Sequence, residues 1–177
     1  LMMTGCASET TTTIKVKSAT KADFSIQVGY DDELLSTIAA MRETTTKELI
    51  KELKSELKGS DAVYAKKTIN GITYHTFTAS AKNIKMTDVE MLLETSGYTN
   101  VCLTKDFFYA TFDPDQVANN LSSIAGLNSK VAELQANDDY DISDFQFFMK
   151  TSVTMKSKIK TTNGKLSNKS KTVKWTI

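Results

Sequence analysis

Residues 62–81 read AVYAKKTINGITYHTFTASA and decide the fold class of this chain. The β-branched and aromatic residues on both sides of this stretch are typical of β-strands. Between them, Asn70-Gly71 fits a type I′ turn, which joins two antiparallel strands. We therefore expect a hairpin with one strand over residues 62–69 and the other over residues 72–81.

Further strand patterns occur on both sides of this hairpin, as alternations of apolar and polar residues. The longest strand is expected over residues 144–160, and Thr162-Asn163-Gly164 is a second type I′ turn signal after it. With a last strand over residues 172–177, we expect the C-terminal part to form a meander of three strands. The other predicted strands cover residues 13–17, 24–28, 101–103 and 107–112.

Apolar residues at helical spacing separate the strand pairs. Residues 33–58 are predicted as one helix, or as two if Thr44-Thr45-Thr46 bends the chain, because β-branched residues are weak helix formers. Since tightly joined strand pairs alternate with helices, the fold class is predicted as α+β. We expect an antiparallel β-sheet built of hairpins, with about three helices packed on one face. The other predicted helices cover residues 87–96 and 114–134.

Two capping boxes are predicted at helix starts. In such a box, the side chain of Ser or Thr and the side chain of Glu three residues later each accept a hydrogen bond from the other residue's backbone N–H. Thr45 with Glu48 fits this pattern, and so does Thr87 with Glu90. We therefore expect a helix to begin near each threonine.

The chain has 177 residues, 40% of them hydrophobic, and a net charge of +1. It can bury a sizeable core, and so small a net charge predicts no binding to nucleic acid. Charge is nevertheless separated along the chain: after Asp144 there are eight lysines and no acid, while the other 14 of the 22 basic residues precede it. A solvated strand face, with lysines that discourage edge pairing, is one interpretation. The other is a basic contact face for anionic polymers or lipid headgroups, formed by Lys150, Lys156, Lys158 and Lys160.

The chain starts with Leu1-Met2-Met3-Thr4-Gly5-Cys6, which resembles the end of a bacterial lipoprotein signal. The small pair Thr4-Gly5 fits a signal peptidase groove, and the thiol of Cys6 would then take a diacylglycerol. We expect lipidation of Cys6, a lipobox remnant and polar tether over residues 1–12, and a single domain over residues 13–177. Acyl chains would hold this domain on the outer face of the bacterial cell membrane. A chance Gly-Cys pair is the alternative.

Residues for catalysis or metal binding are sparse, with one His and two Cys in the chain. A zinc site is not expected from so few ligands. His75 is interpreted as a surface or sheet-rim residue, and Cys102 as a small buried apolar residue and not a nucleophile. The acidic loop at 137–144 lacks the Gly and the closing Glu of an EF-hand, so we favour a helix-terminating loop over a calcium site. We predict no catalytic residue, no metal and no cofactor, and therefore no enzyme.

Two strand-like runs are rich in aromatic residues. Consecutive residues of a strand point to opposite faces, so each run can pack against the core on one side and a helix on the other. The alternative is an apolar groove between the sheet and the helices that takes an acyl chain. The candidate groove residues are Phe107, Phe112, Phe145, Phe147 and Met149.

The C-terminal part carries the turn Thr162-Asn163-Gly164 and then the strand Thr172-Val173-Lys174-Trp175. Together with Cys6, this ending resembles LppM-like lipoproteins, a Gram-positive and actinobacterial family. The resemblance implies an α+β domain on the cell surface, with lipid or glycolipid binding suggested for the mycobacterial member. Family members commonly carry a transmembrane helix after the Trp strand. Of the family's functional residues, only Cys6 carries over to this chain.

These observations predict a non-catalytic cell-surface lipoprotein domain. It would be anchored to the membrane through Cys6 and bind lipid, glycolipid or another component of the envelope. The alternative is a structural or adhesive envelope protein that contacts anionic polymers or partner proteins through a lysine-rich sheet face.

Overall fold

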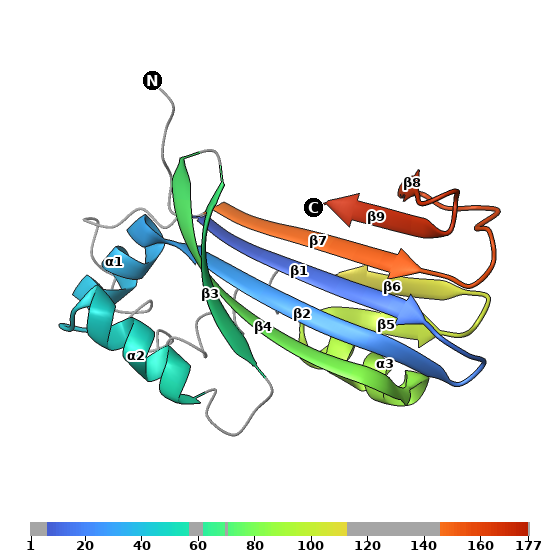
Figure 1. The fold of residues 1–177 in the computed structure, drawn as a ribbon, viewed down its shortest axis with the longest axis horizontal. Coiled ribbons are helices and arrows are strands. Elements are labelled where there is room, and N and C mark those ends of the chain that lie inside the picture. Colours follow the sequence, from blue (N-terminus) through green and yellow to red (C-terminus); the bar gives the residue numbers. More distant parts are fainter. Residues whose placement is uncertain (1–6, 57–61, 70, 113–145, 177) are drawn as a thin grey trace.

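A computed structural model of the chain describes residues 7–56, 62–69, 71–112 and 146–176 (Figure 1). Strands and helices in these residues form the predicted α+β fold, in which helices pack against a sheet. The helices are α1 (Asp32–Met41), α2 (Thr46–Glu56) and α3 (Met86–Thr95). The strands are β1 (Ala7–Val16), β2 (Lys21–Asp31), β3 (Val63–Ile69), β4 (Ile72–Lys85), β5 (Tyr98–Leu103), β6 (Phe108–Phe112), β7 (Gln146–Thr154), β8 (Lys165–Ser167) and β9 (Thr172–Thr176).

Seven of the strands form one sheet in the order β3-β4-β2-β1-β7-β9-β8, and β5 pairs with β6 in a second sheet. The predicted hairpin is confirmed: β3 and β4 pair from Ile69 opposite Ile72 onward, and Gly71 has a φ of 82°. However, β1 and β7 run parallel, so the sheet is mixed and not purely antiparallel. Hairpin signals specify only pairs that are close in sequence. They leave open the direction in which a distant strand adds to the free edge of β1.

The centre of the sheet is β1, which begins at Ala7. The part of the predicted tether from residue 7 to residue 12 is therefore strand, and this expectation is corrected. Within it, Ser8 and Thr12 are fully buried, and the Tyr98 hydroxyl donates a hydrogen bond to Thr12 Oγ1 over 3.4 Å. Threonine is polar, but its β-branched side chain fits a pleated, half-buried surface well.

Two apolar clusters cover the same face of the sheet. Phe24 and Tyr30 lie at even spacing on β2, so their side chains point to the same side, and each belongs to a different cluster. The first cluster is formed with α3, β5 and β6, and the second with α1 and α2, which lie at opposite ends of the sheet (Figure 1). All three described helices pack on this face, and we call the other face of the long sheet the open face. The largest fully buried members of the two clusters are Ile14, Leu35, Leu49, Val89, Leu93 and Val153.

The predicted helix over residues 33–58 is divided into α1 and α2, as the run of threonines allowed. The predicted capping box of α2 is formed. Thr45 N donates to Glu48 Oε2 over 3.1 Å, and Glu48 N donates to Thr45 Oγ1 over 3.2 Å. The Thr45 hydroxyl also donates to Glu48 Oε2 over 2.8 Å, and this bond, followed by the one from Thr45 N, lowers the pKa of the Glu48 carboxyl group.

The capping box predicted for α3 is not formed. Lys85 occupies the N-cap position and makes no capping bond with its side chain. Glu90 Oε1 instead accepts a hydrogen bond from Leu103 N over 2.7 Å, which ties α3 to β5. The local pattern assigned the Glu90 carboxylate to the helix start, but this carboxylate bonds to another element instead.

The predicted helix over residues 114–134 and the acidic loop at 137–144 lie outside the described residues. In the part of the chain that is described, no helix is both long enough and apolar enough to cross a membrane.

The C-terminal strands are ordered differently from the predicted meander. β7 ends at Thr154 and pairs directly with β9, while β8 lies outside β9 at the edge of the sheet. After β7 the chain still bonds across to the residues before β9, through Met155 N to Lys171 O at 2.8 Å and Ile159 N to Ser170 O at 2.7 Å. Residues 155–160 are therefore not part of the predicted long strand.

Asn163 and Gly164 contact β9. Trp175 Nε1 donates a hydrogen bond to Asn163 Oδ1 over 2.8 Å. A Cβ atom on Gly164 would lie 2.5 Å from Val173 Cγ2 and 2.7 Å from Trp175 Nε1, so only glycine fits against β9 here. The left-handed turn conformation expected at Asn163-Gly164 is found instead in three consecutive residues, Asn168, Lys169 and Ser170.

Candidate functional site

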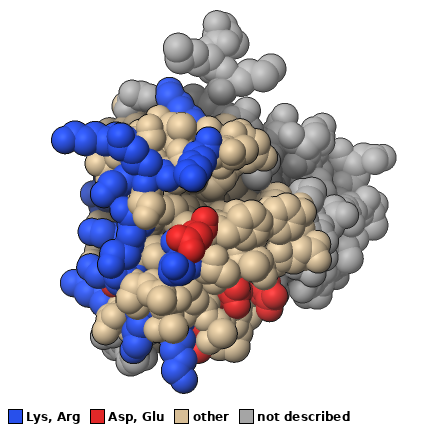
Figure 2. All heavy atoms as spheres, turned by 90° about the vertical axis from the view of Figure 1, so that its right-hand side faces the viewer, with Lys and Arg blue, Asp and Glu red and all other residues tan. Residues whose placement is uncertain are grey.

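Lysines gather at one end of the long sheet, which we call the lysine-rich end, and all of them but the half-buried Lys21 are exposed. Five segments of the chain meet there: the end of β1, the start of β2, the end of β4, the residues after β7 and the residues before β9. Figure 2 views this end and shows Lys and Arg side chains in a band down one side of it. The lysine-rich end comprises Lys15, Lys17, Lys21, Lys82, Lys85, Lys156, Lys158, Lys160, Lys169 and Lys171.

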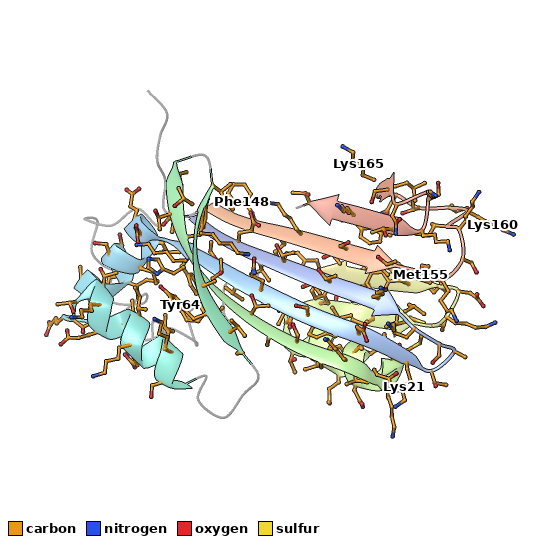
Figure 3. The ribbon with its side chains drawn as sticks, viewed as in Figure 1. Lys21, Tyr64, Phe148, Met155, Lys160 and Lys165 are labelled. Atoms are coloured by element: carbon orange, nitrogen blue, oxygen red, sulfur yellow. The ribbon has the colours of Figure 1, made fainter. Side chains whose placement is uncertain are left out.

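Strand register brings these lysines together. Lys15 of β1 lies opposite Thr154, the last residue of β7, so the lysines after β7 continue from the same level. The turn between β1 and β2 is closed by a hydrogen bond from Lys17 N to Lys21 O over 2.9 Å. Figure 3 shows Lys21 and Lys160 at this same end of the sheet.

Few of these charges are compensated in the described structure. Asp23 Oδ2 lies 3.5 Å from Lys17 Nζ. The Asn83 N–H that bonds to Asp23, followed by the charge of Lys17, lowers the pKa of the Asp23 carboxyl group. By contrast, Lys21 lies directly opposite Lys85. Like charges in directly opposed positions destabilise a sheet, so this end keeps positive charge at a cost in folding stability.

The predicted contact face is divided by the structure. Lys156, Lys158 and Lys160 are exposed at the lysine-rich end. Lys150 lies four residues before the end of β7, and its Nζ is 2.6 Å from Glu9 Oε2. Because β7 ends at Thr154, Lys150 shares no continuous strand face with the other three.

The N-terminal half contributes half of the cluster, which the sequence reasoning missed. Lys15, Lys17, Lys21, Lys82 and Lys85 come from the part of the chain with excess acid. Their local signal is the placement of Lys15, Lys17 and Lys21 around a predicted turn. This signal indicates a site only when the strand register adds the lysines of β4 and of the segment after β7.

Away from this end, the open face of the sheet carries hydroxyl and amide side chains, with Lys67 bonded to Gln27 and Lys150 paired with Glu9. Hydroxyl and amide side chains bond to one another across the strands. Gln27 Nε2 donates to Thr78 Oγ1 over 2.8 Å, and Ser80 Oγ donates to Ser25 Oγ over 3.1 Å. These side chains satisfy each other, so the positive charge of the lysine-rich end is the stronger candidate for recognition.

Of the predicted groove residues, Met149 and Phe112 lie in the first apolar cluster, while Phe107 lies apart from it. Met149 is buried in the core, and Phe112 is half-buried with its ring centroid 6.0 Å from that of Tyr98. Phe107 is 53% exposed between β5 and β6. Phe145 and the side chain of Phe147 lie outside the described residues. Met149 and Phe112 thus serve as core, which was the first of the two interpretations.

His75 is buried, so its interpretation as a surface or rim residue is wrong. Its Nε2 lies 2.6 Å from Asp32 Oδ1, and its Nδ1 lies 2.8 Å from the Tyr64 hydroxyl. A neutral imidazole satisfies both partners if Nε2–H donates to Asp32 and Nδ1 accepts from Tyr64. The three side chains connect β3, β4 and the start of α1.

This chain of hydroxyl, imidazole and carboxylate has the order seen in nucleophile activation. However, burial, and then the charge of Asp32, raise the pKa of Tyr64. A raised pKa disfavours the phenolate that would act as a nucleophile. We therefore interpret the triad as a polar link between elements.

Cys102 is exposed on β5 and has no disulfide partner in the described structure, so its expected burial is wrong. It lies in an apolar run, but the strand alternation points it outward while its neighbour Leu103 is buried. Cys6 lies outside the described residues. No group of three His, Cys, Asp or Glu that could hold a metal ion occurs among the residues with a described position.

Comparison with family models, with curated proteins and with solved structures finds no match for this chain. The resemblance to LppM-like lipoproteins stays a prediction. Functional inference therefore depends on the residues themselves.

Proposed function

We propose that this protein is a non-catalytic, lipid-anchored domain on the outer face of a bacterial cell membrane, and that its lysine-rich end binds an anionic component of the envelope. The observation that carries the binding site is the convergence of lysines from five separate segments. Lysine ammonium groups are compact point charges that suit phosphate and carboxylate groups on a flexible polymer. No single deep pocket is needed for such binding.

The start of β1 and the lysine-rich end lie at opposite ends of the sheet. Cys6 directly precedes Ala7, which starts β1, while Lys15 and Lys17 lie at the other end of the same strand. A ten-residue strand is about 33 Å long. An acylated Cys6 would therefore leave the lysine-rich end facing away from the bilayer, toward wall polymers.

Salt-dependent cosedimentation with purified cell walls tests the binding end. Replacing Lys156 and Lys158 by Glu should weaken binding by roughly tenfold at low salt, because two attractive charges become repulsive. The matched control replaces Lys47 and Lys51, exposed on α2, by Glu and makes the same change in net charge. Equal loss in both variants would show that only net charge matters and would contradict a binding end.

Mass spectrometry of the protein from native membranes tests the anchor. A peptide carrying Cys6 should have the mass of its acylated form, and Cys6→Ala should release the protein from the membrane fraction. An unmodified Cys6 in the native protein would contradict the anchored arrangement but leave the wall-binding result intact.

A further inference from the structure

Two exposed isoleucines stand at the tip of the β3–β4 hairpin. Ile69 and Ile72 are direct cross-strand partners beside the turn, and they are 49% and 39% exposed. A Cβ atom on Gly71 would have no described atom within 4 Å, so no described residue covers this glycine beside the isoleucines. An apolar pair at the end of a projecting hairpin stays exposed to water unless another surface covers it.

This tip projects from the end of the sheet at which β1 begins. Ser8 of β1 is level with Tyr30 of β2, which in turn is level with His75 of β4. The last pair between β2 and β4 is Asp31 with Tyr74, so Ile72 extends two residues, about 7 Å, beyond the level of Ala7. Figure 1 shows the tip rising beside the start of β1.

The charge of the hairpin also distinguishes it from its surroundings. No Asp or Glu occurs between Asp61 and Asp88 in the sequence. Lys66 and Lys67 are exposed on β3, a few residues from the tip, and Lys67 Nζ is within 3.4 Å of Gln27 Oε1. An apolar tip with lysines set back from it matches a bilayer, in which acyl chains lie beneath headgroups that are often anionic.

We infer that the β3–β4 tip inserts Ile69 and Ile72 into the outer leaflet of the membrane that carries the acylated Cys6, with Lys66 and Lys67 at the headgroups. This inference rests on the proposed lipidation, because the anchor one residue before Ala7 brings this end of the sheet to the bilayer. The anchor and the hairpin together make two attachments. They hold the sheet upright and the lysine-rich end away from the surface.

Fluorescence quenching by brominated lipids tests the insertion. The chain carries Cys102→Ser, so that Cys6 alone couples to maleimide lipids in vesicles of phosphatidylcholine and phosphatidylglycerol with brominated acyl chains. Ile72→Trp reports on the tip, and Leu166→Trp on β8 is the matched control because Leu166 is 42% exposed. The native Trp175 is present in both variants and in the parent, which supplies the baseline.

We expect the added tryptophan at position 72 to be quenched at least about threefold more than the one at position 166. Ile69→Trp should give the same result, so that one poorly folded variant cannot decide the outcome. Equal quenching at positions 72 and 166 would overturn the inference. A fluorescence shift at position 72 that a higher protein concentration alone produces would also overturn the inference. A second copy of the chain would then cover the tip.

The chemical coupling makes this result independent of native acylation. If native Cys6 is unmodified but position 72 is quenched in coupled vesicles, the anchor is wrong and the membrane affinity of the tip is retained. If native Cys6 is acylated and position 72 is not quenched, the anchor holds and the inserted tip is wrong.

Discussion

The two ends of the long sheet differ in whether their polar and charged side chains bond to one another. At the end covered by α1 and α2, the Tyr64 hydroxyl, the His75 imidazole and the Asp32 carboxylate bond to one another, and Lys54 Nζ lies 3.6 Å from the centre of the Tyr64 ring. At the lysine-rich end, Lys21 faces Lys85 and most lysines have solvent as their surroundings. The comparison suggests that one end contributes stability and that the other keeps its charge available for a partner.

Alkaline pH should lower folding stability mainly through the end of the sheet covered by α1 and α2. Burial raises the pKa of Tyr30 from 10.0 to about 12. Between these values the unfolded chain binds fewer protons than the folded chain, so stability is fully present below pH 10 and is lost as pH rises through about 12. A shift of two units corresponds to at most about 2.7 kcal/mol.

Urea unfolding at a series of pH values measures this loss. Tyr30→Phe should show a shallower fall in the free energy of unfolding between pH 10 and pH 12. Tyr64 and Tyr74 also have raised pKa values, because of burial first, so part of the fall should remain. An unchanged slope in the variant would show that Tyr30 does not set the alkaline limit.

Breaking the polar triad should cost somewhat less. His75→Leu keeps a similar volume but removes both hydrogen bonds, and we expect a loss of about 2 kcal/mol in the free energy of unfolding. Thermal denaturation at pH 7 measures it. His75→Asn is the comparison that retains a polar side chain. A variant His75→Leu as stable as the parent would mean that the triad contributes no more than the neutral bonds of the open face.

Charge reversal at the lysine-rich end should raise stability and lower binding. Lys85→Glu would attract Lys21 and would place an acid at the N-terminus of α3, so a gain of about 1 kcal/mol is expected. Wall binding should fall in the same variant. Lys165→Glu, opposite Lys174 but away from any helix start, should gain about half as much. A loss of stability in Lys85→Glu would contradict the view that this end keeps its charge at the expense of folding.

Local signals predicted the parts of the fold that depend on neighbours in the chain. Asn70-Gly71 marked its hairpin correctly, and the Thr45–Glu48 box marked the start of α2. The same reasoning failed at Glu90, which bonds to β5, and at Asn163-Gly164, where the constraint is the Trp175 ring and not a turn. In both cases a residue distant in sequence supplied the partner.

The candidate site was predictable only in part. The excess of lysine after Asp144 identified Lys156, Lys158 and Lys160, and the structure leaves them exposed. Lys150 was misplaced because the predicted strand was too long. His75 was expected at the surface because a strand pattern gives alternation but not which face another element covers.

From its sequence alone, this protein is an α+β chain of hairpins and amphipathic helices with charge separated along its length, because those features follow from residues a few positions apart. Only the tertiary structure decided that β1 would join β7 in parallel and that a threonine-rich stretch would be the central strand. It also decided that lysines from the N-terminal half would meet those of the basic tail. Such pairings depend on which faces and edges meet after the chain has folded, and contacts across more than a hundred residues leave no periodic mark on the sequence.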